Sequence, residues 1–515
     1  MGGDDIASGE GTARDPGHLP DRKMQWIFWT CFISLVATSF GFIIRVLTLG
    51  DLQGPFNLSE TQMGEIFGVG LWPFAISIIL FSLIIDKIGY GKALAFAFVC
   101  HVVSAIVTIM ATNYTMLWVG TFILALGNGT VEAVINPVVA TIFSKDKTKW
   151  LNILHAGWPG GLVLGGLAVL IMGPEVSWQV KVGLILIPAA VYGLMLLRCV
   201  FPVHERVTAG VSYKAMLQEA GIIGALIVVA IMAREVGSIF GLSSIWQVVI
   251  GALLIVPYAA YVRALGRPMF IFLLLIMIPL ATTELGTDSW ISDLIKPEME
   301  GLGLQAGWVL VFTSFIMMVL RFVAGPIVHK LSPLGLLAMS SLIAVAGLFS
   351  LSLATGMAIF AAALLYALGK TFFWPTMLGV VAERFPKGGA LTINAIGGMG
   401  MLSVGVIGAV FLGNIQDKQI DKDLLAQDAA LHARVIGEEE TSVFGSYRSL
   451  NQTKLDGLES AESTVIEGIQ GSAKKNALKT VAIFPAIMFV CFLILILYFR
   501  SKGGYKAVDL AAGEE

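Results

Sequence analysis

A glutamate lies in the middle of a stretch that is otherwise apolar enough to cross a membrane. Glu132 is part of residues 117–142, with Asn128 four residues before it and Asn136 four residues after it. On a helix this spacing puts the three polar side chains on one face. Because an ionisable group at membrane depth is costly without a partner or a function, Glu132 is predicted to couple transport to protons or to bind a polar substrate.

A second polar pair follows on the next apolar stretch, where Asn152 and His155 are three residues apart. Polar faces on two consecutive helices predict one aqueous cavity lined by both. His155 is a second candidate proton carrier because imidazole titrates near neutral pH. A histidine that only hydrogen-bonds substrate or backbone is an equally good interpretation. Trp158, directly before Pro159, marks a helix interruption of the kind tolerated beside a cavity, and is a candidate substrate contact.

Arg45, in the first apolar stretch, is the natural partner for Glu132. An opposite charge within about 4–6 Å favours the ionised carboxylate. Three interpretations of Glu132 therefore stay open: a proton carrier, a static ion pair with Arg45, or a group that only binds substrate.

Polar residues also interrupt the apolar stretches of the second half. Lys370 and Trp374 are four residues apart and share a helix face. A tryptophan ring offers its face to the C–H surface of a sugar. We expect Glu284, Lys370, Trp374 and Asn394 to contact substrate, with Lys370 pairing to Glu284 or Asp288 as the alternative.

The composition is that of a membrane protein. Of 515 residues, 57% are hydrophobic and 13% are charged, against roughly 25% charged in soluble domains. The net charge of −2 predicts no nucleic-acid partner. The four cysteines have no metal-ligand spacing, and no motif predicts a cofactor or an enzyme. A spanning helix needs about 20 apolar residues. Fourteen stretches meet this length: 25–47, 62–85, 93–112, 116–143, 151–172, 181–200, 218–238, 244–263, 268–288, 305–330, 333–353, 357–383, 390–414 and 479–499.

The loops between these stretches alternate in charge. Basic loops, such as those at Lys145–Lys149 and at Arg384 and Lys387, alternate with acidic ones, and the positive-inside rule puts the basic set and both termini in the cytoplasm. The acidic set includes the long segment 416–477, with eleven acids against seven bases. It is either a small external lid or a solvated spacer, and its composition favours the spacer. The polar start of the chain predicts a disordered tail.

The loop after the second stretch reads Ser82-x-x-x-Asp86-Lys87-x-Gly89-Tyr90-Gly91-Lys92. It resembles the signature G-x-x-x-D-R/K-x-G-R-R/K of the major facilitator superfamily, with Ser82 in place of the first glycine. A similar charged turn, at Gly325–Pro333, follows the tenth stretch. The resemblance implies that Asp86 locks the two halves together on the cytoplasmic side. The gating residues expected from the two turns are Asp86, Lys87, Gly89, Lys92 and Lys330, with Arg321 assigned to gating or structural pairing nearby.

A second resemblance is to the fucose/glucose/galactose:proton symporter branch of that superfamily. It rests on Gly127-x-Gly129-x-x-Glu132-x-x-x-Asn136-Pro137, on Leu151-Asn152-x-x-His155 and, more loosely, on Thr282–Ile291. The branch has an acid in its first span, where this chain has Arg45, and a glutamine where it has His155. The resemblance implies an all-α polytopic membrane fold of two six-helix bundles. The domains expected are a tail at 1–24, bundles at 25–200 and 268–500, an inserted helix pair at 214–264 and a tail at 501–515.

The expected function is secondary transport of a small polar metabolite, such as a sugar, by proton symport with alternating access. One alternative is an organic anion, such as a sugar acid, clamped by Arg45 and Lys370. A lipid or drug exporter would need a more apolar cavity. An alternative of another class is a non-transporting receptor or scaffold that uses 416–477. We expect a monomer in the bilayer of a bacterial inner membrane, with the solute and protons as its partners.

Overall fold

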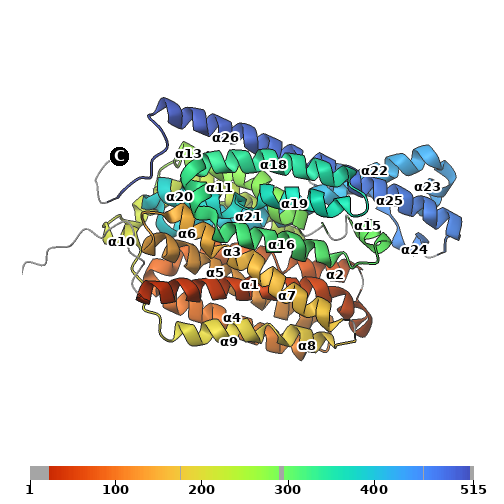
Figure 1. Ribbon diagram of the computed structural model, residues 1–515, viewed down its shortest axis with the longest axis horizontal. Coiled ribbons are helices and arrows are strands. Elements are labelled where there is room, and N and C mark those ends of the chain that lie inside the picture. Colours follow the sequence, from red (N-terminus) through yellow and green to blue (C-terminus); the bar gives the residue numbers. More distant parts are fainter. Residues whose placement is uncertain are drawn as a thin grey trace, which may run out of the picture.

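The computed structural model describes residues 22–58, 60–173, 175–288, 291, 295–442, 444–455 and 457–510. The tail expected at 1–24 lies almost entirely outside these residues. Long helices lie side by side and form an elongated bundle, with a smaller unit projecting from one end (Figure 1). The N-terminal helices fill one side of the bundle and the C-terminal helices the other (Figure 1).

The membrane-spanning prediction is confirmed within the described residues. Thirteen helices there are long and apolar enough to cross a membrane, and a bent pair raises the number to fourteen. The pair is α16 (Gly307–Phe322) and α17 (Ala324–Leu331), which meet at 67°. The sequence stretch 305–330 is therefore not one straight helix, and its two parts point in different directions.

The first bundle, as the name is used below, comprises the helices up to residue 196. They are α1 (Arg22–Phe56), α2 (Glu60–Gly68), α3 (Trp72–Ile88), α4 (Tyr90–Ile109), α5 (Tyr114–Ile142), α6 (Lys147–Leu154), α7 (Gly157–Met172), α8 (Trp178–Gly183) and α9 (Leu186–Leu196).

Glycines let two of these helices approach closely. A Cβ atom added at Gly161 on α7 would lie 2.0 Å from the Ser39 hydroxyl on α1, and one at Gly165 would lie 2.6 Å from Ile43. Gly161 and Gly165, four residues apart on α7, thus let α7 pack closely on α1.

A short helix and an antiparallel pair follow the first bundle: α10 (Glu205–Thr208), α11 (Tyr213–Ile239) and α12 (Ser244–Val262). Helix α11 packs against α3, α13 and α21, whereas α12 packs mainly against α11 and is largely exposed. The inserted pair thus lies at the periphery of the bundle.

The second bundle comprises the helices and helical turns from residue 268 to 408, together with the last helix. They are α13 (Pro268–Ala281), η1 (Thr282–Gly286), α15 (Lys296–Gly301), α16, α17, α18 (Pro333–Leu353), α19 (Ala358–Lys370), α20 (Phe373–Arg384), η2 (Pro386–Gly388), α21 (Gly389–Ser403), η3 (Val404–Gly408) and α26 (Ile483–Ser501). It meets the first bundle where α21 packs on α3 and α5, α16 on α7, and α20 on α6.

The projecting unit corresponds to segment 416–477, and the solvated spacer favoured from its composition is wrong. Its elements are α22 (Ala409–Gln427), α23 (Ala429–Val435), the antiparallel strands β1 (Ile436–Ser442) and β2 (Gly445–Leu450), α24 (Gln452–Leu455) and α25 (Ser460–Val481). They enclose a separate apolar core that includes Leu424, Leu431, Val435 and Ile469. The charges lie outside this core, which is why composition alone concealed it.

The two ends of the bundle are named by their loops. The basic end carries residues 143–147, 197–212 and 384–388, and both described chain ends lie there (Figure 1). The acidic end is the opposite one, where the projecting unit lies.

Candidate functional site

A small cavity lies between the two bundles near their middle. Residues that the sequence analysis singled out form much of its wall. Its lining is Phe74, Glu132, His155, Trp158, Glu284, Leu285, Arg321, Trp374 and Met401. We call it the central cavity.

Glu132 and His155 are joined by Asn136. The Asn136 amide nitrogen donates to the Glu132 carboxylate at 2.7 Å, and His155 Nε2 donates to Asn136 Oδ1 at 2.9 Å. All three side chains are buried. The donor direction follows from the amide, whose nitrogen faces the carboxylate and leaves its oxygen to accept. The predicted meeting of these two helices at one polar site is therefore present.

Arg321 joins the two bundles at the cavity. It donates to Glu284 Oε1 at 2.6 Å, to the Thr371 carbonyl at 2.6 Å and to the His155 carbonyl at 2.9 Å. Both carbonyls lie at helix interruptions, between α6 and α7 and between α19 and α20, where helix geometry leaves acceptors unsatisfied. One guanidinium thus caps two broken helices and holds a buried carboxylate.

The expected gating position of Arg321 near the basic end is wrong. A continuous helix over 305–330 would put Arg321 near the basic end, but α16 ends at Phe322 and the chain then bends. Arg321 therefore stays at the level of Glu284, and the structural-pairing alternative describes its contacts.

Two tryptophans lie at the cavity, one beside each helix interruption. Trp158 and Trp374 both line it, and the Trp374 backbone N–H donates to Glu284 Oε2 at 3.0 Å. Lys370 does not line it. Its ammonium pairs with Asp288 and lies 5.0 Å from the centre of the Tyr366 ring. Lys370 thus makes the ion pair that the sequence offered as the alternative to substrate contact.

Arg45 is not the partner of Glu132, and this expectation is wrong. Its guanidinium donates to the hydroxyls of Thr121, Ser104 and Thr108 at 2.6–2.9 Å, inside the first bundle. The sequence does not fix the rotation of α1 about its axis, and that rotation turns Arg45 toward α4 and α5.

Asn128 does not share the helix face of Glu132 and Asn136 that the spacing predicts. Its Oδ1 accepts from His101 Nε2 at 3.0 Å, within the first bundle. A helix turns about 100° per residue, so each four-residue step rotates the face by about 40°. Over the eight residues from Asn128 to Asn136 the rotation carries Asn128 away from the central cavity.

Two further asparagines bridge the bundles instead of lining the cavity. Asn152 on α6 donates to the Thr376 hydroxyl on α20 at 3.1 Å. Asn394 on α21 donates to the Ala133 carbonyl on α5 at 3.0 Å. In this conformation both serve contact between the halves.

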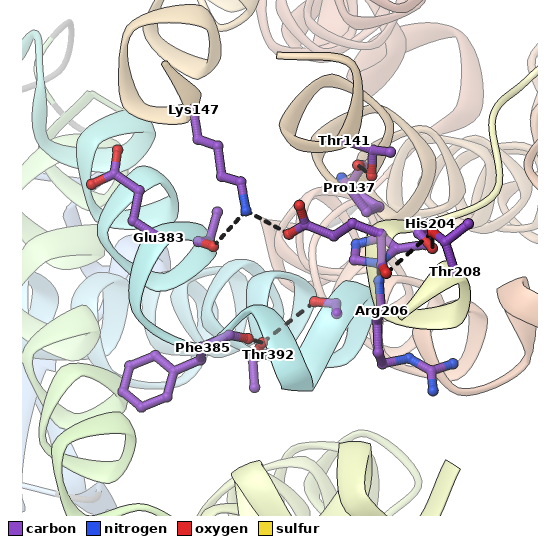
Figure 2. Close-up of polar contacts among 12 residues, drawn as sticks. Pro137, Thr141, Lys147, His204, Arg206, Thr208, Glu383, Phe385 and Thr392 are labelled. Carbon is purple, nitrogen blue, oxygen red and sulfur yellow. Dashed lines mark hydrogen bonds and ion pairs between the residues drawn. The ribbon is translucent and has the colours of Figure 1, made fainter. Parts of the chain in front are cut away.

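The basic end is closed by direct contacts between α6 and α20. The Lys147 amine donates to the Ala382 carbonyl at 3.2 Å and pairs with Glu205 at 2.5 Å (Figure 2). The Thr148 hydroxyl and backbone N–H both donate to Glu383 Oε1. We call Lys147, Thr148, Ala382 and Glu383 the latch. Sequence analysis missed its role, since Lys147 was counted only as one more basic loop residue.

Asp86 contributes only indirectly to the contact between the two bundles at the basic end. Asp86 pairs with Arg206 on α10, which follows the first bundle, and not with a residue of the second bundle. Helix α10 in turn packs on η2. Asp86 therefore contacts the second bundle only through α10 in the described structure.

The other expected gating residues lie around these contacts. The Lys87 amine is 5.5 Å from the centre of the Tyr213 ring, and Gly89 has φ +86° where α3 ends. Lys92 and Lys330 are exposed. Of these residues, Gly89 has a clear structural role, because a positive φ favours glycine.

His204 is buried beside the latch, outside the membrane-spanning helices. Its Nδ1 accepts from the Arg206 backbone N–H at 3.0 Å, so it caps α10 (Figure 2). Burial, with the Lys147 and Arg206 charges nearby, lowers the pKa of His204 from 6.5 to about 3. The imidazole is thus held neutral.

Comparison with known families identifies this architecture. The model of the Major Facilitator Superfamily matches residues 29–409. The chain belongs to the Major Facilitator Superfamily. Its family and its apolar helices of spanning length make it an integral membrane protein.

Curated relatives in this superfamily are distant. The protein TsgA homolog of Buchnera aphidicola from Schizaphis graminum is 25% identical over 183 residues, which are 35% of this chain and 47% of the relative. The cis,cis-muconate transport protein of Acinetobacter baylyi is 22% identical over 174 residues, which are 34% of this chain and 42% of the relative. The matched part of the chain thus spans less than half the length of these relatives.

Solved structures show the same fold. The Escherichia coli fucose:proton symporter FucP aligns with a TM-score of 0.58 at 15% identity, covering 92% of this chain and 98% of that one. The human organic anion transporter MFSD10 aligns with a TM-score of 0.59 at 11% identity, covering 92% and 100%. At these identities the likeness supports the superfamily fold and leaves the solute to be argued from the site.

Proposed function

We propose that this protein carries a neutral, hydroxyl-rich solute of the sugar type across the membrane together with a proton, and that Glu132 carries the proton. The observation that supports this most directly is that Glu132 has no direct ion pair. Among the described residues, its carboxylate contacts the Asn136 amide and no cation lies within 4 Å of it.

The acids of the second bundle have a different environment. Glu284 is paired with Arg321 and Asp288 with Lys370. A buried carboxylate without a counter-charge must gain a proton or meet a cation during the cycle. Glu132 is thus the acid at the central cavity best suited to accept and release a proton, with His155 one amide away.

The charges around the central cavity favour a neutral solute. Its lining contains two carboxylates, Glu132 and Glu284, and one guanidinium, Arg321. When Glu132 is protonated these charges cancel. An anionic solute would meet Glu284 and, after proton loss, Glu132 as like charges. The rings of Trp158 and Trp374 offer apolar faces for the C–H surface of a sugar.

The organic-anion alternative rests on a clamp made by Arg45 and Lys370. Neither lines the central cavity, because Arg45 is held by hydroxyls in the first bundle and Lys370 by Asp288. Both would have to leave these partners to grip one solute. The printed functions of MFSD10 and the muconate transport protein make this the alternative to test against.

We further propose that the basic end faces the cytoplasm of a bacterial inner membrane, as the positive-inside rule indicates. The latch then closes the cytoplasmic side, and release of the solute inward requires α6 and α20 to separate. The Asn152 and Asn394 contacts would break in the same step and become available to the solute.

The test is uptake by the full chain in proteoliposomes, with and without an inward proton gradient. The panel pairs neutral sugars with their acid counterparts. We expect the gradient to drive accumulation of a neutral sugar. Glu132→Gln should abolish gradient-driven accumulation while sparing exchange of solute, because the amide mimics a permanently protonated carboxyl.

The matched control is Glu175→Gln, since Glu175 is exposed and remote from the cavity. Uptake restricted to the acids would overturn the neutral-solute proposal. Full accumulation by Glu132→Gln would remove Glu132 as the proton carrier.

A further inference from the structure

A second cavity lies inside the first bundle, between α1, α2, α4, α5 and α8. The space between its walls, counted together with the part open to solvent, is about 630 Å³. Most of its wall is apolar, and the polar residues gather around Arg45. The polar lining is Arg45, Thr48, Thr108, Thr121 and Asn128, and the apolar lining is Phe42, Val46, Leu49, Leu52, Ile66, Phe67, Leu117, Leu124, Ala125 and Val182. We call it the Arg45 cavity.

Arg45 brings a full positive charge to this cavity without an anion to balance it. Its two terminal nitrogens donate to the hydroxyls of Thr121, Ser104 and Thr108, and more weakly to the Gly120 carbonyl. All four acceptors are neutral. Its Nε has no hydrogen-bond partner. A cation in an apolar bundle is stable when paired, and hydroxyls supply only part of that stabilisation.

The acids nearest the rim of the cavity are already engaged. Asp51 pairs with Lys181 at 2.8 Å, and Glu65 accepts a hydrogen bond from Tyr114. Within the described residues, no carboxylate lies within ion-pair distance of Arg45. Arg45 thus has no anionic partner among the described residues.

Asn128 adds hydrogen-bond donors to the same cavity. Its oxygen accepts from His101, which fixes the orientation of the amide. Its nitrogen then has no acceptor among the described residues, and Asn128 lines the cavity. A cation and an amide donor over an apolar pocket form the usual arrangement for a small organic acid, in which a few polar groups orient an apolar body.

We propose that the Arg45 cavity is a second ligand site, which binds a small monocarboxylate with an apolar body. The carboxylate lies against Arg45 and Asn128, and the apolar part lies among Leu49, Leu52 and Ile66 toward the acidic end. The site shares no lining residue with the central cavity. A third pocket lies between the two, with Phe42 and Phe67 in common with the Arg45 cavity and Trp158 and Met401 in common with the central one.

The test measures binding of benzoate to the full chain purified in detergent, by titration calorimetry. We expect saturable binding, with benzyl alcohol, the uncharged analogue, binding at least about tenfold more weakly. Arg45→Gln removes the charge, and Leu49→Trp fills the pocket while leaving the charge in place. Both should abolish binding. Arg198→Gln, at an exposed arginine, should bind as the unchanged protein does.

The outcomes separate this inference from the proposed transport function. Glu132→Gln should lose accumulation and still bind benzoate, because Glu132 lines the central cavity and does not line the Arg45 cavity. Absent binding, equal binding of benzyl alcohol, or full binding by both Arg45→Gln and Leu49→Trp overturns the inference. Competition by chloride as strong as by benzoate would also overturn it, because it would mark the site as one for inorganic anions.

Discussion

The two bundles handle buried charge in opposite ways. In the second bundle Glu284 is paired with Arg321 and Asp288 with Lys370. In the first, Glu132 and Arg45 hydrogen-bond to neutral groups, although they are opposite charges within one bundle. The second bundle thus uses charge to hold broken helices together. The first leaves these two charges without a direct ion pair, where a proton or a ligand can act on them.

The largest effect should come from breaking the Arg321 network. Arg321→Met leaves Glu284 buried without its counter-charge and leaves the Thr371 and His155 carbonyls without their capping donor. We expect a loss of about 3–5 kcal/mol in the free energy of unfolding, measured by thermal or denaturant unfolding in detergent.

A paired variant provides the control. Arg321→Met combined with Glu284→Leu removes both charges and should recover much of the loss, because no uncompensated ion remains. If the single variant unfolds like the unchanged protein, the contrast between the bundles fails.

A smaller effect is expected where the two bundles meet. Thr148→Val removes the hydroxyl donor to Glu383 Oε1 and should weaken the latch by about 1–2 kcal/mol. That is a shift of at least about fivefold toward forms open at the basic end. Spin labels at Lys149 and Lys387, in a background without native cysteines, would report the wider distances.

Thr141→Val is the matched control for the latch. The Thr141 hydroxyl donates to the Pro137 carbonyl of its own helix (Figure 2). It should leave the distance distribution unchanged. Equal distributions in the Thr148 and Thr141 variants would mean that the latch does not hold the halves together.

Titration of His204 at the basic end should change the free energy of unfolding by a smaller amount than the latch variant does. The pKa of His204 is about 3 in the folded protein and 6.5 ordinarily. Between these two pH values the unfolded chain therefore binds a proton at His204 and the folded chain does not. The stabilisation is complete above pH 6.5 and is lost as the pH falls toward 3. Between pH 7 and 5.5 we expect His204 to cost about 1 kcal/mol in the free energy of unfolding.

His204→Asn tests this dependence, because an asparagine oxygen can also cap α10 and does not titrate. Its unfolding temperature should fall less than that of the unchanged protein over the same pH range. Parallel curves for the two proteins would assign the pH dependence to other groups.

The smallest effect is the one that sharpens the contrast most. Arg45→Met removes an unbalanced charge, and the remaining hydroxyls keep acceptors, since Thr121 donates to the Leu117 carbonyl and Ser104 to that of Gly120. We expect a change below about 1 kcal/mol in the free energy of unfolding, against several for Arg321→Met. If Arg45→Met lowered the free energy of unfolding as much as Arg321→Met does, Arg45 would be a structural residue like Arg321.

Local spacing predicted the part of the site that lies within single helices. The link from Glu132 to Asn136 needs only a four-residue step, and the interruptions beside Trp158 and Trp374 follow from the prolines after them. The membrane spans were predictable for the same reason, because each depends on one continuous stretch of sequence.

Contacts between helices were harder to predict. The partner of Arg45 depends on the rotation of α1, and Asn128 depends on the drift of a helix face over two turns. The latch joins residues more than 230 positions apart, and one of its acceptors is the Ala382 carbonyl, which carries no side-chain signal. Segment 416–477 was wrongly predicted to be a solvated spacer. Its composition shows many charges and does not reveal the few apolar residues that meet in a core.

The projecting unit is joined to the second bundle by a continuous helix and by an ion pair. Helix α22 follows α21 and η3 without a loop, and at 19 residues it is about 28 Å long. Lys475 on α25 also pairs with Glu298 on α15 at 2.5 Å. A tilt of about 10° in such a rod moves its far end by about 5 Å. A fluorophore on the projecting unit would therefore report a small tilt of α22 as a larger displacement at the acidic end.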